Sequence, residues 1–136
     1  MSYKYVIDAY AWIEYFRASD EGEKAKSYIE EENSATPTIV VAEVSRKLIT
    51  EVSRGRETQD GKEKKLEFIR ASTQIIQLDF DTAKLAGQTD TERKRLAKNW
   101  GMADSIILAA ARSAGAKVVT GDYHFKDLKG EVIMIK

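Results

Sequence analysis

Cysteine is absent from this chain of 136 residues, which also has one proline and one histidine. Without cysteine there is no disulfide framework, no thiol nucleophile and no zinc ribbon, and we expect a location in the reducing cytoplasm. A single histidine also excludes metal centres built from several histidines, including the HExxH motif of zinc proteases. Any metal site in this chain therefore depends mainly on oxygen ligands.

The chain also lacks an excess of charge and a long hydrophobic run. Lys plus Arg and Asp plus Glu number 22 each, so no overall positive field attracts nucleic acid, and any such binding must be local. The longest purely apolar stretch, 106–111, is far shorter than the roughly 20 residues that cross a bilayer, and no signal sequence precedes the first predicted strand. We therefore expect a soluble protein with no membrane partner.

The motifs of several enzyme classes are missing as well. GxSxG, GxxxxGK and GxGxxG do not occur, which excludes serine hydrolases, P-loop enzymes and dinucleotide binders. Hydrophobic residues nevertheless make up 43% of the chain and charged residues 32%, enough for a core and a well-solvated surface. We expect one compact domain spanning residues 1–136.

The sequence does contain a regular alternation of short β-prone runs and helical patterns. Predicted strands cover residues 3–7, 34–36, 74–78, 117–120 and 131–135. Predicted helices cover residues 9–16, 20–32, 37–52, 62–72, 81–100 and 102–114. The alternation predicts an α/β fold, namely a three-layer α/β/α sandwich with a mostly parallel sheet of about five strands.

Four acidic residues differ from the many that lie in solvated charge runs. Each lies just beyond a predicted strand or in the first turns of the helix that follows one; they are Asp8, Glu43, Asp104 and Asp122. In a parallel α/β sheet such positions open onto one edge, where ligands bind. Carboxylates gathered there repel one another unless a cation lies between them, and oxygen-rich sites suit Mg²⁺ or Mn²⁺. The sequence therefore predicts a carboxylate-walled metal site.

Each of these residues also has a purely structural interpretation. Asp8 and Asp122 could cap the helices that follow them. Asp104 could interact with the dipole of its own helix, although the helix face that it shares is strongly apolar. Glu43 could lie on a solvated helix flank. The position of all four at one sheet edge is what favours a common site.

Other polar residues near this edge are assigned structural roles. Asp79 and Asp81 also follow a predicted strand, but Asp81 before Thr82 has the pattern of an ordinary helix start, so we leave both aspartates outside the site. His124 lies beside Asp122 and could touch a substrate. We expect it instead to be a surface or packing histidine.

Three longer segments surround the four acids. They are YVIDAYAWIEYF at Asp8, VVAEVSRKL at Glu43 and MADSIILAAARSAGAKVVTGDYHF, which contains Asp104 and Asp122. With the alternation of strands and helices across the whole chain, they resemble the PIN-domain nucleases, specifically the small ribonuclease toxins of the VapC type. That family commonly has Ser or Thr one or two residues after the first aspartate, where this chain has Ala9 and Tyr10.

The resemblance implies a metal-dependent endoribonuclease with a PIN-like fold, acting as the toxin of a toxin-antitoxin pair. On the matching positions, the acidic site for Mg²⁺ or Mn²⁺ would consist of Asp8, Glu43, Asp104 and Asp122, with Thr120 as a supporting hydroxyl. The implied partners are an RNA substrate, an antitoxin that masks the pocket with an arginine or lysine, and a second copy of the chain in a homodimer. The candidates for guiding RNA, which otherwise serve helix solubility, are Arg46, Lys47, Arg93, Lys94, Arg95 and Lys98.

The sequence alone leaves two other functions open. A receiver-like signalling domain is also a small α/β fold with an acidic pocket, but it needs adjacent acids after the first strand, and here that strand ends in the single Asp8. A PIN-like scaffold without catalysis, serving in assembly, is favoured by Ala9. Stable phosphorylation by acetyl phosphate would support the first alternative, and metal binding without nuclease activity would support the second.

Overall fold

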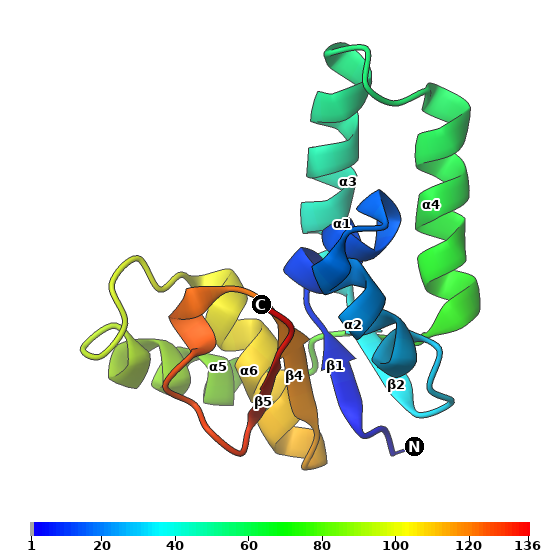
Figure 1. Cartoon of the computed structure of the whole chain (residues 1–136). Coiled ribbons are helices and arrows are strands. Elements are labelled where there is room, and N and C mark those ends of the chain that lie inside the picture. Colours follow the sequence, from blue (N-terminus) through cyan, green and yellow to red (C-terminus); the bar gives the residue numbers. More distant parts are fainter. Residues whose placement is uncertain (1) are drawn as a thin grey trace.

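The computed structural model describes residues 2–136 and shows an α/β fold with a five-stranded parallel sheet in that range (Figure 1). The strands are β1 (Tyr5–Ile7), β2 (Ser34–Pro37), β3 (Gln74–Ile76), β4 (Lys117–Thr120) and β5 (Val132–Met134). The helices are α1 (Ala9–Arg17), α2 (Asp20–Ile29), α3 (Thr38–Ser53), α4 (Gln59–Ser72), α5 (Phe80–Arg93) and α6 (Met102–Ala114), with a short 3₁₀ helix η1 (Tyr123–Phe125). The predicted fold class is confirmed, and the sheet is wholly rather than mostly parallel.

The order of the strands places a switch point in the middle of the sheet. The order is β3-β2-β1-β4-β5, so the chain first moves outward from β1 to β3 and then returns to the other side of β1 for β4 and β5. Strands β1 and β4 are neighbours and pair Val6 with Val118. In doubly wound sheets, ligands bind beyond the carboxyl ends of the strands at such a reversal.

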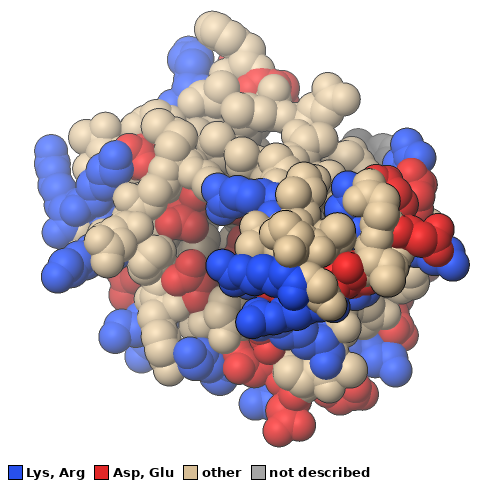
Figure 2. Space-filling model, turned by 90° about the horizontal axis from the view of Figure 1, so that it is seen from above, with Lys and Arg blue, Asp and Glu red and all other residues tan. Residues whose placement is uncertain are grey.

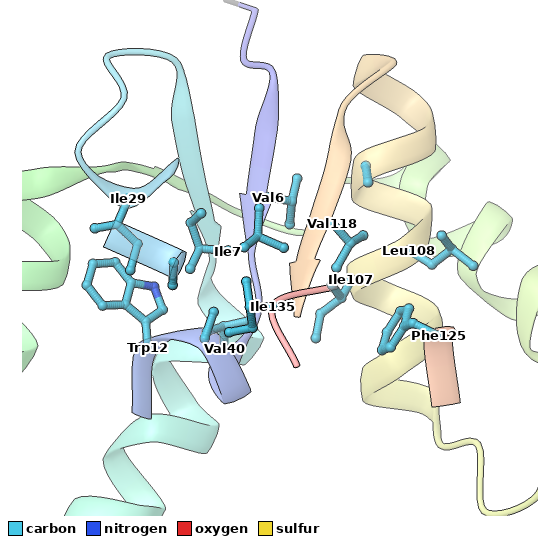
Figure 3. Close-up of a cluster of buried hydrophobic side chains, with 14 of the residues drawn as sticks. Val6, Ile7, Trp12, Ile29, Val40, Ile107, Leu108, Val118, Phe125 and Ile135 are labelled. Atoms are coloured by element: carbon cyan, nitrogen blue, oxygen red, sulfur yellow. The ribbon is translucent and has the colours of Figure 1, made fainter. Parts of the chain in front are cut away.

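The core lies on both faces of this sheet. Helices α1 and α2 lie on one side of the sheet and α5 and α6 on the other, while α3 and α4 extend beyond the upper end of the strands (Figure 1). Figure 3 shows the buried Trp12 and Ile29 on one side and the buried Leu108 and Phe125 on the other, with Val6 of β1 between them. None of the helices within residues 2–136 has the length and apolar character of a membrane span.

The start of helix α4 differs from the prediction. It begins at Gln59 rather than Lys62, because the Thr58 hydroxyl accepts a hydrogen bond from the N–H of Gly61 at 2.9 Å. Residues 59–61, which precede the predicted start, therefore belong to the first turn of this helix.

Helix α5 differs from the prediction at both ends. Asp79 rather than Asp81 is its N-cap, since the Asp79 carboxylate accepts a hydrogen bond from the N–H of Thr82 at 2.8 Å. The helix ends at Arg93 and does not continue to Gly101. Residues 94–99 form turns, and the positive φ of 65° at residue 99 is incompatible with a continuing helix. This basic segment is therefore a loop that leads into α6.

Candidate metal centre

Asp8 follows β1 directly and is buried at the switch point between β1 and β4. Its carboxylate accepts a hydrogen bond from the Thr120 hydroxyl at 2.7 Å. Within the described chain its side chain makes no capping bond to α1, so helix capping does not account for it. Burial raises the pKa of Asp8 to about 7, and the charges of Glu43 and Asp104 add to this rise, against the opposing bond from Thr120. A cation bound nearby would favour the ionised form of this carboxyl group.

The Thr120 hydroxyl links two of the predicted site residues. It donates to Asp8 and accepts a hydrogen bond from the backbone N–H of Asp122 at 3.0 Å. Thr120 is the fully buried last residue of β4. One hydroxyl therefore fixes the turn after β4 relative to the end of β1.

Asp104, Asp122 and His124 form a compact polar cluster at this edge of the sheet. Each offers one ligand atom, and these atoms all lie within 4.8 Å of one another. The Nδ1 atom of His124 is 3.2 Å from Oδ2 of Asp104 and 3.4 Å from Oδ1 of Asp122. Over the described range 2–136, this set does not include Asp8 or Glu43. Two carboxylates and an imidazole can therefore contact one ion directly.

Backbone groups orient both carboxylates of this cluster. The N–H of Gly101 donates to Oδ2 of Asp104 at 3.1 Å, at the start of α6. The N–H of His124 donates to Oδ1 of Asp122 at 2.9 Å, so Asp122 caps η1 as its structural interpretation proposed. Each carboxylate has a second oxygen that can coordinate a cation. Capping and metal binding are therefore compatible at both residues.

Glu43 approaches the cluster from α3, where it is half-buried. Burial raises the pKa of Glu43, and the charges of Asp104 and Asp122 raise it further, while Arg46 lowers it. Burial also raises the pKa of Asp104, and the charge of Asp122 adds to the effect. Each of the four predicted acids, Asp8, Glu43, Asp104 and Asp122, is therefore close enough to at least one of the others for their charges to interact.

The structure places His124 in the polar cluster rather than on the open surface. Its half-buried imidazole contacts the carboxylates of Asp104 and Asp122. The sequence signal for this position in the cluster was that His124 stands two residues after Asp122, because one tight turn can bring both side chains to the same side of the chain.

The predicted RNA-guiding residues have different surroundings. The prediction for Arg93 is wrong, because this residue is only 4% exposed and its guanidinium binds Asp127 at 2.8 Å. Lys47 and Lys94 each form an ion pair with an acidic residue one helical turn away, as expected of solubility residues. These three residues are therefore weak candidates for phosphate contacts.

Arg46, Arg95 and Lys98 are exposed and can contact a ligand. Arg46 lies close enough to Glu43 for its charge to lower the pKa of that carboxyl. Figure 2 looks down on the face toward which the strands point, where acidic side chains border a hollow and Lys and Arg side chains lie next to it. Positive charge is thus available beside the acidic cluster despite the zero net charge of the chain.

Tyr10, which departs from the family pattern after Asp8, packs over Gly121. The Tyr10 ring lies so close to this glycine that an added Cβ would collide with it. The Tyr10 hydroxyl donates to Glu21 at 2.6 Å, which holds the ring in place. The close approach explains why the turn between Thr120 and Asp122 contains glycine.

We expect Gly121→Ala to destabilise the chain by about 1–3 kcal/mol, the usual range for overpacking a filled space. The matched control is Gly87→Ala in α5, where an added Cβ would meet no described atom within 4 Å apart from the local backbone of the helix and the adjoining residues. That substitution should stabilise the helix by roughly 0.5–1 kcal/mol. Urea unfolding followed by circular dichroism measures both, and equal effects would show that Tyr10 does not restrict this turn.

Solved structures similar to this chain include bacterial toxins. A toxin-antitoxin complex from Klebsiella pneumoniae contains a chain with 20% identity and a TM-score of 0.73, over 98% of each chain. PAE2754 from Pyrobaculum aerophilum has 19% identity and a TM-score of 0.74, over 99% of this chain and 92% of that one. VapC20 from Mycobacterium tuberculosis, a sarcin-ricin loop cleaving toxin, has 14% identity and a TM-score of 0.66, over 93% and 95%. These similarities show a shared fold.

Sequence comparison gives a family. No curated protein matches the chain. The PIN domain model, in contrast, matches residues 5–131, a range that contains every acidic residue of the cluster. The chain therefore belongs to the PIN domain family.

Proposed function

We propose that this chain is a metal-dependent endoribonuclease that cleaves RNA phosphodiester bonds and is the toxin of a toxin-antitoxin pair. The observation that carries the proposal is the convergence of Asp8, Glu43, Asp104 and Asp122 at one sheet edge, where the pKa values of the first three are raised. The family match supports a nuclease, and the sarcin-ricin loop cleaved by the similar VapC20 supports RNA as the substrate class.

The residues of the cluster fit a cation of the Mg²⁺ or Mn²⁺ type. Carboxylate oxygens dominate the donor set, and His124 adds one nitrogen. Burial, and to a smaller extent the charges of Glu43 and Asp104, raises the pKa of Asp8, and a cation bound nearby would favour its ionised form. When bound, the ion would lower the pKa of the attacking water and neutralise charge on the leaving oxygen.

In the proposed reaction the side chains have separate tasks. Asp104 and Asp122, oriented by backbone N–H groups, would hold the cation together with Asp8, which Thr120 orients. Half-buried Glu43 orients the water that attacks phosphorus in line with the leaving oxygen. Arg46 lies one turn further along α3 and binds a phosphate of the RNA.

The deciding experiment is cleavage of a labelled RNA with a single-stranded loop by the purified chain. We expect cleavage in Mg²⁺ or Mn²⁺ and none in EDTA, with activity restored when the ion is added back. Failure to cleave any loop-containing RNA in either ion, together with retained binding of Mn²⁺, would favour the scaffold alternative.

We further propose an antitoxin partner and a homodimer, both in the cytoplasm. Structural similarity to chains of toxin-antitoxin complexes supports the antitoxin, and the acidic cluster is complementary to an arginine or lysine supplied by that partner. Apolar surface at the free edge of β3 supports the homodimer. A groove of about 750 Å³ there is lined in part by Ile39, Ile75 and Leu78, and the neighbouring Phe80 is 72% exposed.

A further inference from the structure

Arg93, the last residue of α5, is a buried cation beside the candidate metal centre. Its Nη1 and Nη2 atoms donate to the two carboxylate oxygens of Asp127, both at 2.8 Å. Nη2 also donates to the backbone carbonyl of His124 at 2.9 Å. The guanidinium lies over the indole of Trp100, 4.5 Å from the ring centre. One side chain thus joins the end of α5, the loop before α6 and the segment around η1.

Trp100 extends this connection to α6 and η1. Its Nε1–H donates to the Ser105 hydroxyl at 2.7 Å, and that hydroxyl donates to Asp90 of α5 at 2.9 Å. Its ring packs against Phe125 of η1, with ring centres 4.9 Å apart. The residue that follows it, Gly101, supplies the N–H that orients Asp104. Both halves of the Asp104–Asp122–His124 cluster are therefore attached to Arg93 through short contacts.

We propose that Arg93 is a positioning residue that holds η1 against the start of α6, so that Asp122 and His124 face Asp104. The inference rests on the proposed function of this cluster as a metal site. A three-residue 3₁₀ helix such as η1 has too few hydrogen bonds to be stable by itself, so tertiary contacts must order it. The bond from Arg93 to the His124 carbonyl acts on the backbone of that helix directly.

The chemistry of the contacts requires arginine. The planar guanidinium binds both oxygens of Asp127, reaches the His124 carbonyl and stacks on Trp100 at the same time. A lysine has one nitrogen and no planar face, so it cannot make all four contacts. Because Asp127 neutralises the charge of Arg93, the arginine positions the cluster without serving as a countercharge or as a contact for RNA.

Asp127→Asn and Arg93→Lys test this role. The Asp127 side chain is 50% exposed, so its substitution should leave the fold intact while it removes one charge-assisted pair. The matched control is Glu131→Gln, which weakens a second arginine–carboxylate pair, Arg112–Glu131, at 2.7 and 3.2 Å. The hydrogen bonds of Glu131 go to α6 rather than to Arg93 or η1.

We expect Mn²⁺ to bind Asp127→Asn and Arg93→Lys about 10- to 100-fold more weakly than the wild type in isothermal titration calorimetry, the usual effect of losing an outer partner of a metal site. The kcat for RNA cleavage should fall with little change in KM, since the RNA itself is not contacted. Glu131→Gln should keep wild-type values. A lower melting temperature with unchanged Mn²⁺ affinity would show a merely structural role and overturn the inference.

Hydrogen exchange in the metal-free protein provides a readout that does not depend on the proposed function. The backbone amides of 123–125 should exchange faster in Asp127→Asn than in the wild type, and not in Glu131→Gln. Unchanged exchange would overturn the role of Arg93 even where the wild type binds Mn²⁺ and cleaves RNA. A wild type that neither binds Mn²⁺ nor cleaves RNA would instead refute the proposed function.

Discussion

Asp104→Asn is expected to lower the rate of metal-dependent RNA cleavage by more than about 100-fold. Loss of an outer partner of a metal ligand commonly reduces affinity or activity 10- to 100-fold, and Asp104 belongs to the cluster itself. Asparagine keeps the size of the side chain and can still accept the hydrogen bond from the N–H of Gly101, so the start of α6 should be preserved. Single-turnover cleavage of a labelled RNA in Mn²⁺ measures the effect, with circular dichroism as the check on folding.

The matched control is Asp81→Asn. Asp81 is an exposed aspartate in the first turn of α5, so its substitution makes the same chemical change on the surface. It should cleave RNA at the wild-type rate. If Asp104→Asn and Asp81→Asn were equally active, Asp104 would not be part of the reactive site.

Asp8→Asn is expected to stabilise the metal-free chain at pH 8 by a few kcal/mol. Burial raises the pKa of Asp8 from 3.8 to about 7, so folding favours the protonated form. Its contribution to stability is fully present below pH 4 and is lost as the pH rises through 7, where the buried carboxylate ionises. Three pKa units correspond to roughly 4 kcal/mol as an upper limit. Urea unfolding of both proteins between pH 5 and pH 8 should therefore show a flatter profile for Asp8→Asn.

Mn²⁺ should remove the difference in stability between the wild type and Asp8→Asn. The ion binds the ionised carboxylate of the folded state and stabilises it by mass action, so the wild type gains more from added Mn²⁺ than Asp8→Asn does. The wild type should be the less stable protein in EDTA and lose that disadvantage in Mn²⁺. An Asp8→Asn variant that is less stable than the wild type at pH 8 in EDTA would contradict the account of Asp8 as an uncompensated buried carboxylate.

The acidic residues could be placed from the sequence because their positions are local properties. Asp8 follows a strand, and Asp104 lies in the first turn of a helix, and the parallel sheet brings such positions to one edge. His124 could not be placed in this way, since its partner Asp104 lies 20 residues away and the contact depends on how η1 packs against α6. Sequence proximity to Asp122 alone does not distinguish a site histidine from a surface one.

The basic segment after α5 shows the opposite case, in which a local pattern misleads. Lys and Arg are good helix formers, so the run 93–98 predicts a longer helix. In the structure, Arg93 turns inward to Asp127, 34 residues away, and the chain leaves the helix at that point. The energy of this ion pair, in which only the arginine is buried, comes from tertiary structure and is not part of intrinsic helix propensity.

The pairing of β4 with β1 has a consequence for protein synthesis. The Thr120 hydroxyl that orients Asp8 is 112 positions away along the chain, and Asp122 lies still further on. A nascent polypeptide on the ribosome therefore exposes Asp8 and Glu43 long before the rest of the cluster exists. On the proposed function, we expect an unfinished copy without Thr120 and Asp122 to be unable to cleave RNA, because its metal site is incomplete.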